Sequence, residues 1–167
     1  MSVRWMTIGA VGLALAGCAT RDRVPPPAPS ASGETITYST GRCFGACPAF
    51  TVTIASSGRG TFTGQSHTAV QGARSFTATP RQYAAFAAAL APYRPNGEAL
   101  YQPGSKLCGQ VATDMPSVDV RWQGGSRRAA HLYYYYGCDM QKNAKMGDAL
   151  GNAIDLLPVE PLIGPRP

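Results

Sequence analysis

Cys43 and Cys47 are separated by three residues and followed by Pro48. Two thiolates at this spacing can bind a soft metal such as Cu(I), with a histidine such as His131 as a further ligand, or cycle between dithiol and disulfide. The same cysteines can form a structural disulfide, because Gly45 lets the chain between them turn tightly. We prefer the disulfide and keep a copper or redox site at Cys43, Cys47 and His131 as the alternative.

The residues after Pro48 favour the disulfide. The cysteine spacing is similar to that of thioredoxin-like copper chaperones, but those proteins place the second cysteine at the start of a helix, whose dipole activates the thiol. Here residues 50–54 alternate between apolar residues and threonine, which is typical of a strand with one buried face. Neither His67 nor His131 lies in a recognisable ligand motif, so we expect no cofactor.

Cys18 ends a different motif, Leu15-Ala16-Gly17-Cys18, behind Arg4 and an uncharged apolar run over residues 6–15. The run is about half the roughly 20 residues of a spanning helix, and the order of parts resembles a bacterial lipoprotein signal peptide. We therefore expect a signal peptide over residues 1–17 and a membrane anchor of acyl chains, palmitate among them, on Cys18. Ala19, in place of aspartate, favours the periplasmic face of the outer membrane.

The rest of the chain divides into three parts. Residues 18–34 are rich in proline, alanine and serine, a composition that favours an extended tether. Residues 35–158 carry the periodic patterns of one globular domain, and residues 159–167 are expected to form a proline-rich tail. The formal charge of +6 is spread thinly along the chain, which favours an ordinary solvated surface and does not suit nucleic acid. The alternative is contact with anionic lipid or an acidic envelope polymer, and an envelope protein or polymer is the candidate partner.

With Cys18 assigned to lipid, four cysteines remain for an oxidising compartment: Cys43, Cys47, Cys108 and Cys138. Three pairings are open. We favour Cys43 with Cys47 and Cys108 with Cys138, whose loop of about 30 residues would contribute about 3 to 4 kcal/mol to stability.

Periodicity predicts strands near residues 35–39, 50–54, 61–63, 67–77, 118–122 and 130–136. Thr79-Pro80 begins a helix with apolar residues at helical spacing, and a second apolar helical stripe runs over residues 146–157. Residues 94–116 are rich in glycine and proline and are expected to form a long loop that Cys108 pins. The predicted fold is α+β: a single domain with an antiparallel sheet, two helices on one of its faces and disulfide staples.

Tyr133, Tyr134, Tyr135 and Tyr136 follow one another, so a strand would place two rings on each face. An outward pair suits recognition, because tyrosine offers a large contact area at low entropic cost, with Arg121, Arg127 and Arg128 as a polar rim. The alternative is that both pairs of tyrosine rings are covered by other parts of the protein, so that neither is exposed for binding. Asp114 is expected to cap a turn by accepting hydrogen bonds from backbone amides, and Asp139 to suit the approach to the final helix. Functional use of either carboxylate is the alternative.

The serine residues do not indicate hydrolase chemistry. Ser39, Ser66 and Ser105 are not in a Gly-x-Ser-x-Gly elbow, and a chance serine, histidine and aspartate are expected in any chain of this length. We therefore expect a binding or structural module in preference to an enzyme.

Three motifs together carry a family resemblance: Cys43-Phe44-Gly45-Ala46-Cys47-Pro48, Thr113-Asp114-Met115-Pro116 and Tyr136-Gly137-Cys138. They resemble a bacterial family known as domain of unknown function 6438, over residues 35–157. The resemblance implies no activity, ligand or catalytic residue.

Overall fold

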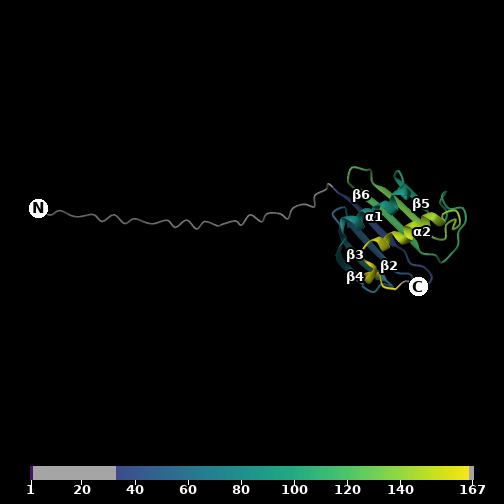
Figure 1. Ribbon diagram of the computed structural model, residues 1–167, viewed down its shortest axis with the longest axis horizontal. Helices are drawn as coiled ribbons and strands as arrows, with labels where there is room; N and C mark the ends of the chain where they lie inside the picture. Colours follow the sequence, from purple (N-terminus) through teal and green to yellow (C-terminus); the bar gives the residue numbers. More distant parts are fainter. Residues whose placement is uncertain (2–32, 166–167) are drawn as a thin grey trace.

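The computed structural model describes Met1 and residues 33–165, which fold as a seven-stranded sheet with helices on one side (Figure 1). The strands lie in the order β4-β3-β2-β1-β6-β7-β5. Neighbours are antiparallel except for β5, which pairs with β7 in parallel. The strands are β1 (Glu34–Thr40), β2 (Ala49–Ala55), β3 (Arg59–Ser66), β4 (Gly72–Thr77), β5 (Glu98–Tyr101), β6 (Ser117–Gly124) and β7 (Ala130–Tyr135).

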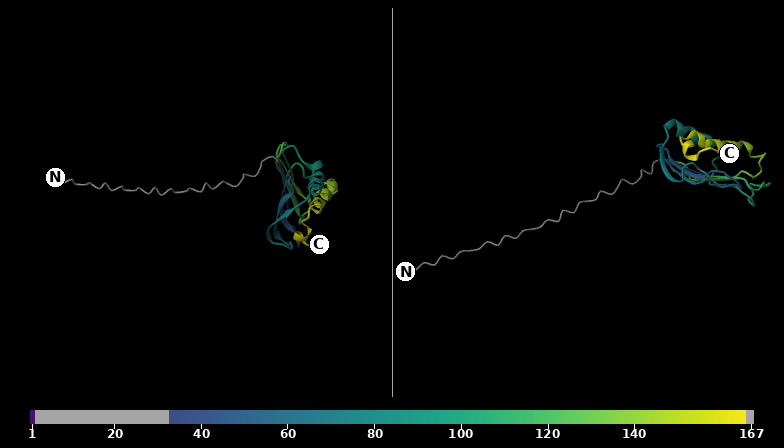
Figure 2. Two further views of the ribbon diagram at one scale, coloured as in Figure 1. Left: turned by 60° about the vertical axis from the view of Figure 1, so that its left-hand side comes forward. Right: turned by 90° about the horizontal axis from the view of Figure 1, so that it is seen from below.

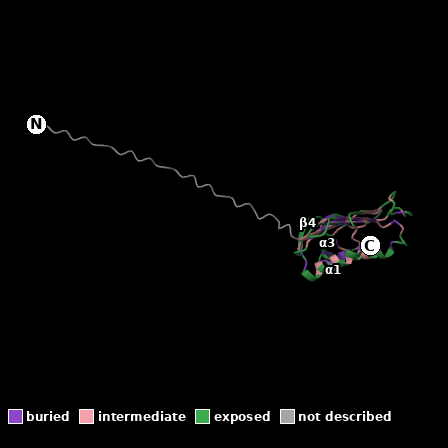
Figure 3. Cartoon of the chain, turned by 90° about the horizontal axis from the view of Figure 1, so that it is seen from above, coloured by how far each residue is buried: buried purple, intermediate pink, exposed green. Residues whose placement is uncertain are grey.

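Alternation along the strands separates an apolar face from a polar one. Side chains such as Ile36, Val52 and Val120 are fully buried on the apolar face, against the helices. No helix of the described residues covers the polar face (Figures 2 and 3). The domain therefore has two layers, and its α+β class and disulfide staples agree with the sequence prediction.

Two main helices form the second layer: α1 (Pro80–Leu90) and α2 (Ala144–Ala153). A capping box starts α1: the Thr79 hydroxyl accepts a bond from the Gln82 backbone N–H, and the Gln82 side chain accepts one from the Thr79 N–H. On α2, a Cβ added to Gly151 would lie 3.1 Å from the hydroxyl oxygen of Tyr136, so glycine lets this helix lie close to the sheet. The short 3₁₀ helices η1 (Ala91–Tyr93) and η2 (Ile154–Leu156) extend the two helices.

The prediction of a continuous loop over residues 94–116 is wrong, because residues 98–101 of this segment form β5. This strand has only four residues and follows Gly97, so it offers little periodicity to detect. Its inward residues Ala99 and Tyr101 pack against the core, and the Tyr101 ring lies 6.1 Å from that of Tyr134. The contact places β5 at the edge of the sheet, next to β7.

The globular part also extends beyond its predicted end at Pro158, into the segment expected to be a tail. Val159 and Ile163 are buried; Val159 directly precedes α3 (Glu160–Ile163), and Ile163 is its last residue. The backbone N–H of Ala69 donates to the Ile163 carbonyl, and that of Val70 to the Leu162 carbonyl. These contacts attach the C-terminal segment to the β3–β4 loop.

The predicted signal peptide, Cys18 and most of the predicted tether lie outside the described residues. Within residues 33–165, no helix is long and apolar enough to cross a membrane.

Candidate functional site

Both disulfides lie at one end of the sheet, where β1, β6 and β7 meet their loops. The Cα atoms are 5.7 Å apart in Cys43–Cys47 and 5.3 Å apart in Cys108–Cys138, within the ordinary range. These are the two pairs that the sequence favours. We call the loops over residues 41–48, 102–116 and 136–143 the disulfide end.

The alternative metal ligands are not assembled. Cys43 and Cys47 are bonded to each other, and both ring nitrogens of His131 bond to carboxylates. Within the described part of the chain, no group of three or more histidine, cysteine or acidic side chains could hold a metal ion. The copper site therefore has no geometric support in this structure.

The four tyrosines divide between the two faces of the sheet. Tyr134 and Tyr136 point toward the helices: Tyr134 is buried, and Tyr136 donates a hydrogen bond to the Gly147 carbonyl at 3.3 Å. Tyr133 and Tyr135 lie on the opposite, polar face, where the Tyr135 hydroxyl accepts a bond from the Met115 N–H. The second pair is thus the outward one, although Tyr135 is partly buried and packs against the core.

The three predicted arginines do not form one rim. Arg121 lies on the polar face and bonds Asp119 through Nε at 2.9 Å and Nη2 at 3.2 Å. Arg127 and Arg128 lie in the β6–β7 turn, where the Arg128 carbonyl accepts a bond from Arg94. The structure therefore groups Arg121 with Tyr133 and leaves the other two arginines at the turn.

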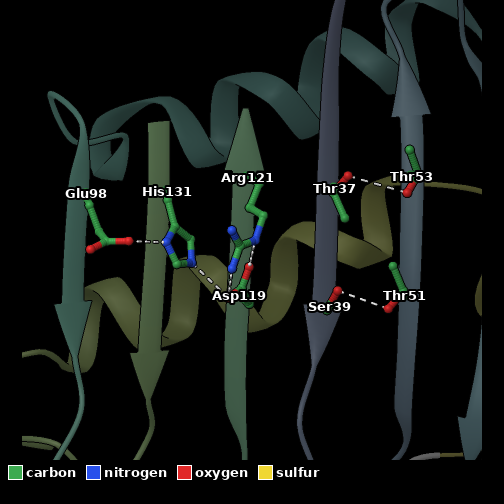
Figure 4. A network of polar contacts seen from close by, with 8 residues as sticks. All are labelled: Thr37, Ser39, Thr51, Thr53, Glu98, Asp119, Arg121 and His131. Atoms are coloured by element: carbon green, nitrogen blue, oxygen red, sulfur yellow. Dashed lines mark hydrogen bonds and ion pairs between the residues drawn. The ribbon is translucent and has the colours of Figure 1, made fainter. Parts of the chain in front are cut away.

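A row of charged side chains crosses β5, β7 and β6 on the polar face (Figure 4). Nδ1 of His131 lies 2.8 Å from Oε2 of Glu98, and Nε2 of His131 lies 2.8 Å from Oδ2 of Asp119. Asp119 also holds Arg121, and its register partner on β7 is Tyr133. The row is thus Glu98, His131, Asp119 and Arg121, with the imidazole between two carboxylates and the guanidinium at one end.

Hydroxyl groups continue this row across the central strands (Figure 4). The hydroxyls of Thr37 and Thr53 lie 3.4 Å apart, and those of Ser39 and Thr51 lie 3.0 Å apart. The register carries the series onto β3 and β4 through Thr61, Thr63, Ser75 and Thr77. Thr61 and Ser75 are register partners, whereas Thr63 faces Ala73 and Thr77 faces Arg59, so the hydroxyls form a series with interruptions, which we call the hydroxyl lattice. We call this lattice and the charged row together the open face.

Glu98 and Asp119 are the site residues that sequence reasoning missed. In residues 118–122, apolar side chains alternate with Asp119 and Arg121, so the strand pattern places Asp119 on the same face as Arg121. This pattern could have identified Asp119. Glu98 carried no such signal, because it lies in a segment expected to be a loop.

The two aspartates near turns have structural roles. The Asp139 carboxylate accepts bonds from the backbone N–H groups of Gly109 and Gln110, both at 2.8 Å, and these bonds lower its pKa. Asp114 has a positive φ of 66° and accepts a bond from the Thr113 hydroxyl. Asp139 therefore fastens the loop that precedes β6.

Tyr136 predicts a pH dependence of stability. Burial, with smaller contributions from Tyr134 and Asp148, raises the pKa of Tyr136 to about 12, above the usual value of about 10. The stabilisation is present below pH 10 and is lost as the pH rises toward 12, because the unfolded state gives up the proton first. We expect a decrease of about 2 to 3 kcal/mol in the unfolding free energy over this range.

Urea denaturation at several pH values measures this decrease. A Tyr136→Phe variant should show a flatter profile, and a Tyr133→Phe variant should retain the decrease. A profile that Tyr136→Phe leaves unchanged would assign the pH dependence to another group.

Fold and site together define a small, disulfide-containing α+β domain with a polar, helix-free sheet face. The chain belongs to the family described as Domain of unknown function (DUF6438), whose model matches residues 34–155. No curated protein matches the chain significantly.

Proposed function

We propose that this protein is a lipid-anchored lipoprotein of the cell envelope that binds a glycan polymer through its open face. Cys18 would supply the anchor to the outer membrane, on its periplasmic side, within the predicted tether over residues 18–34. The observation that carries the binding proposal is the fixed row of Glu98, His131, Asp119 and Arg121 beside Tyr133.

Binding is favoured over catalysis by the way these groups are held. Each ring nitrogen of His131 bonds a carboxylate, and Arg121 bonds Asp119, so the charged groups hold one another in place. Rigid polar groups on sheet strands lose little entropy when a ligand binds. The open face is therefore organised before any ligand arrives.

A glycan matches the chemistry of this surface. Sugar hydroxyls both donate and accept hydrogen bonds, as do the serine and threonine hydroxyls, while the carboxylates accept and the guanidinium donates. The row contains two carboxylates, of Glu98 and Asp119, and the guanidinium of Arg121, which suits a neutral or mixed polymer better than a polyanion. The Tyr133 ring adds an apolar surface for the C–H groups of a sugar. A polymer with repeating hydroxyls could follow the lattice across several strands.

Co-sedimentation tests this proposal. The chain is purified from envelopes, where its intact mass reports acylation of Cys18, and is mixed with insoluble peptidoglycan. We expect the wild-type protein to sediment and Tyr133→Ala to lose at least about tenfold in affinity, as central aromatic contacts do.

Arg127→Ala is the matched control, because this arginine lies in the β6–β7 turn and not on the open face. It should bind as the wild type does. Equal binding of Tyr133→Ala and the wild type, or no sedimentation of the wild type, would contradict the glycan proposal. An unacylated Cys18 would contradict the anchor alone.

A further inference from the structure

Exposed apolar side chains are concentrated at the disulfide end. Within residues 33–165, the large hydrophobic side chains that are exposed are Phe44, Leu107, Val111, Met140 and Leu156. All but Leu156 lie in the three loops of the disulfide end. Phe44 is the extreme case at 88% exposed, inside the short loop that the Cys43–Cys47 bond closes. A phenylalanine held in solvent by a covalent constraint has no role in the core.

The three loops are joined to one another, so their apolar residues are held together at one end of the sheet. The Phe44 N–H donates to the Asp114 carbonyl at 3.2 Å, which links the first loop to the second. Val111 forms a β-bridge with Cys138, and the Cys108–Cys138 bond joins the second loop to the third. Val111 and Met140 line one shallow hollow of about 570 Å³.

Basic residues stand next to the exposed apolar ones. Arg42 precedes Phe44 by two positions, Lys106 adjoins Leu107, and Lys142 follows Met140 and lines the same hollow. The acidic residues at this end are Asp114 and Asp139, and the Asp139 carboxylate is already bonded to two backbone amides. Apolar side chains with lysine or arginine beside them are typical of loops that enter the interface of an anionic membrane.

We propose that the disulfide end inserts into the headgroup region of an anionic lipid bilayer. Phe44, Leu107, Val111 and Met140 enter the boundary between headgroups and acyl chains, and Arg42, Lys106 and Lys142 contact the lipid phosphates. A second copy of the chain fits this surface less well, since it would bring the same basic residues together. The two disulfides hold the loops in place, so insertion requires little ordering.

This surface lies at one end of the sheet, whereas the open face is a face of the sheet. β1 begins at Glu34, where the described domain starts, and ends at Thr40, next to the disulfide end (Figure 1). The proposed membrane contact therefore lies at the end of β1 opposite to Glu34, the first residue of the strand. It does not depend on glycan binding or on acylation of Cys18.

Vesicle binding tests the proposal with the mature chain, residues 18–167, carrying Cys18→Ser so that no anchor contributes. Vesicles of phosphatidylethanolamine and phosphatidylglycerol are compared with vesicles of phosphatidylcholine. We expect binding to the anionic vesicles, a loss of about tenfold in Phe44→Ser, and a loss of about fivefold in each of Lys106→Gln and Lys142→Gln. Raised salt should weaken binding.

Leu156→Ser is the matched control, because this exposed leucine lies on η2, outside the three loops. It should bind as the wild type does, and thermal melting should show that Phe44→Ser remains folded. A wild-type protein that ignores anionic vesicles would overturn the proposal. So would equal binding to phosphatidylcholine, or equal losses in Phe44→Ser and Leu156→Ser.

Discussion

Replacing Arg94 by alanine is expected to lower the unfolding free energy by about 3 to 5 kcal/mol, as breaking a buried ion pair does. The Arg94 side chain is only 4% exposed and bonds the carboxylate of Glu34. It also donates to the Arg128 carbonyl at 2.8 Å, and its guanidinium lies 5.5 Å from the centre of the Trp122 ring. Alanine would leave Glu34 and the carbonyl unpaired and remove the cation–π contact.

A second ion pair on the same domain supplies the comparison. Arg121 is 50% exposed and bonds Asp119 at the surface, so Arg121→Ala should cost less than about 1 kcal/mol. Guanidinium denaturation of the two variants measures both losses. Arg94→Lys should recover little of the stability, because an ammonium group lacks the planar fork that bonds two partners and stacks on an indole. Equal losses of unfolding free energy in Arg94→Ala and Arg121→Ala would contradict the expectation that the buried ion pair contributes more to stability than the exposed one.

Removal of the Cys108–Cys138 bond should cost about 3 to 4 kcal/mol on the chain-entropy model, because it closes a long loop. The two cysteines are 30 positions apart. Their bond joins the connection between β5 and β6, which contains Cys108, to the connection between β7 and α2, which contains Cys138. Both are buried, so alanine is the suitable replacement. We expect the Cys108→Ala/Cys138→Ala variant to unfold at a clearly lower denaturant concentration.

The Cys43–Cys47 bond provides the matched comparison, since its cysteines are only 4 positions apart. The same model assigns its loop about 2 kcal/mol. Denaturation of Cys43→Ala/Cys47→Ala alongside the other double variant measures the difference. A larger loss from the short loop would mean that contacts at Cys43 and Cys47, and not chain entropy, determine the stability of the disulfide end.

Much of the fold follows from local pattern. Strict alternation in residues 50–54 and the Thr79-Pro80 start of α1 depend only on neighbouring residues, and the structure contains both elements. The two-and-two division of the tyrosines follows in the same way from the period of a strand. These features are local, so sequence is sufficient to predict them.

The remaining features depend on tertiary contacts. β5 is a strand because it pairs with β7 and because Ala99 and Tyr101 pack against the core. Its four residues are too few to show a strand periodicity in the sequence. The charged row needs Glu98 opposite His131, which only the parallel register of β5 provides. The burial of Ile163 likewise depends on the β3–β4 loop. Sequence periodicity contains no information about which distant segments meet.

The central position of β1 has a consequence for how the chain acquires its structure. β1 pairs with β2 on one side and with β6 on the other, so the middle of the sheet joins segments from opposite halves of the chain. Strands β1 to β4 can assemble as a local meander, whereas pairing of β6 with β1 closes a loop that contains β2 to β5. Closing so large a loop is slow compared with forming hairpins. The domain is thus expected to reach its native state late, when β6 docks, and to remain incompletely folded while its C-terminal half is missing.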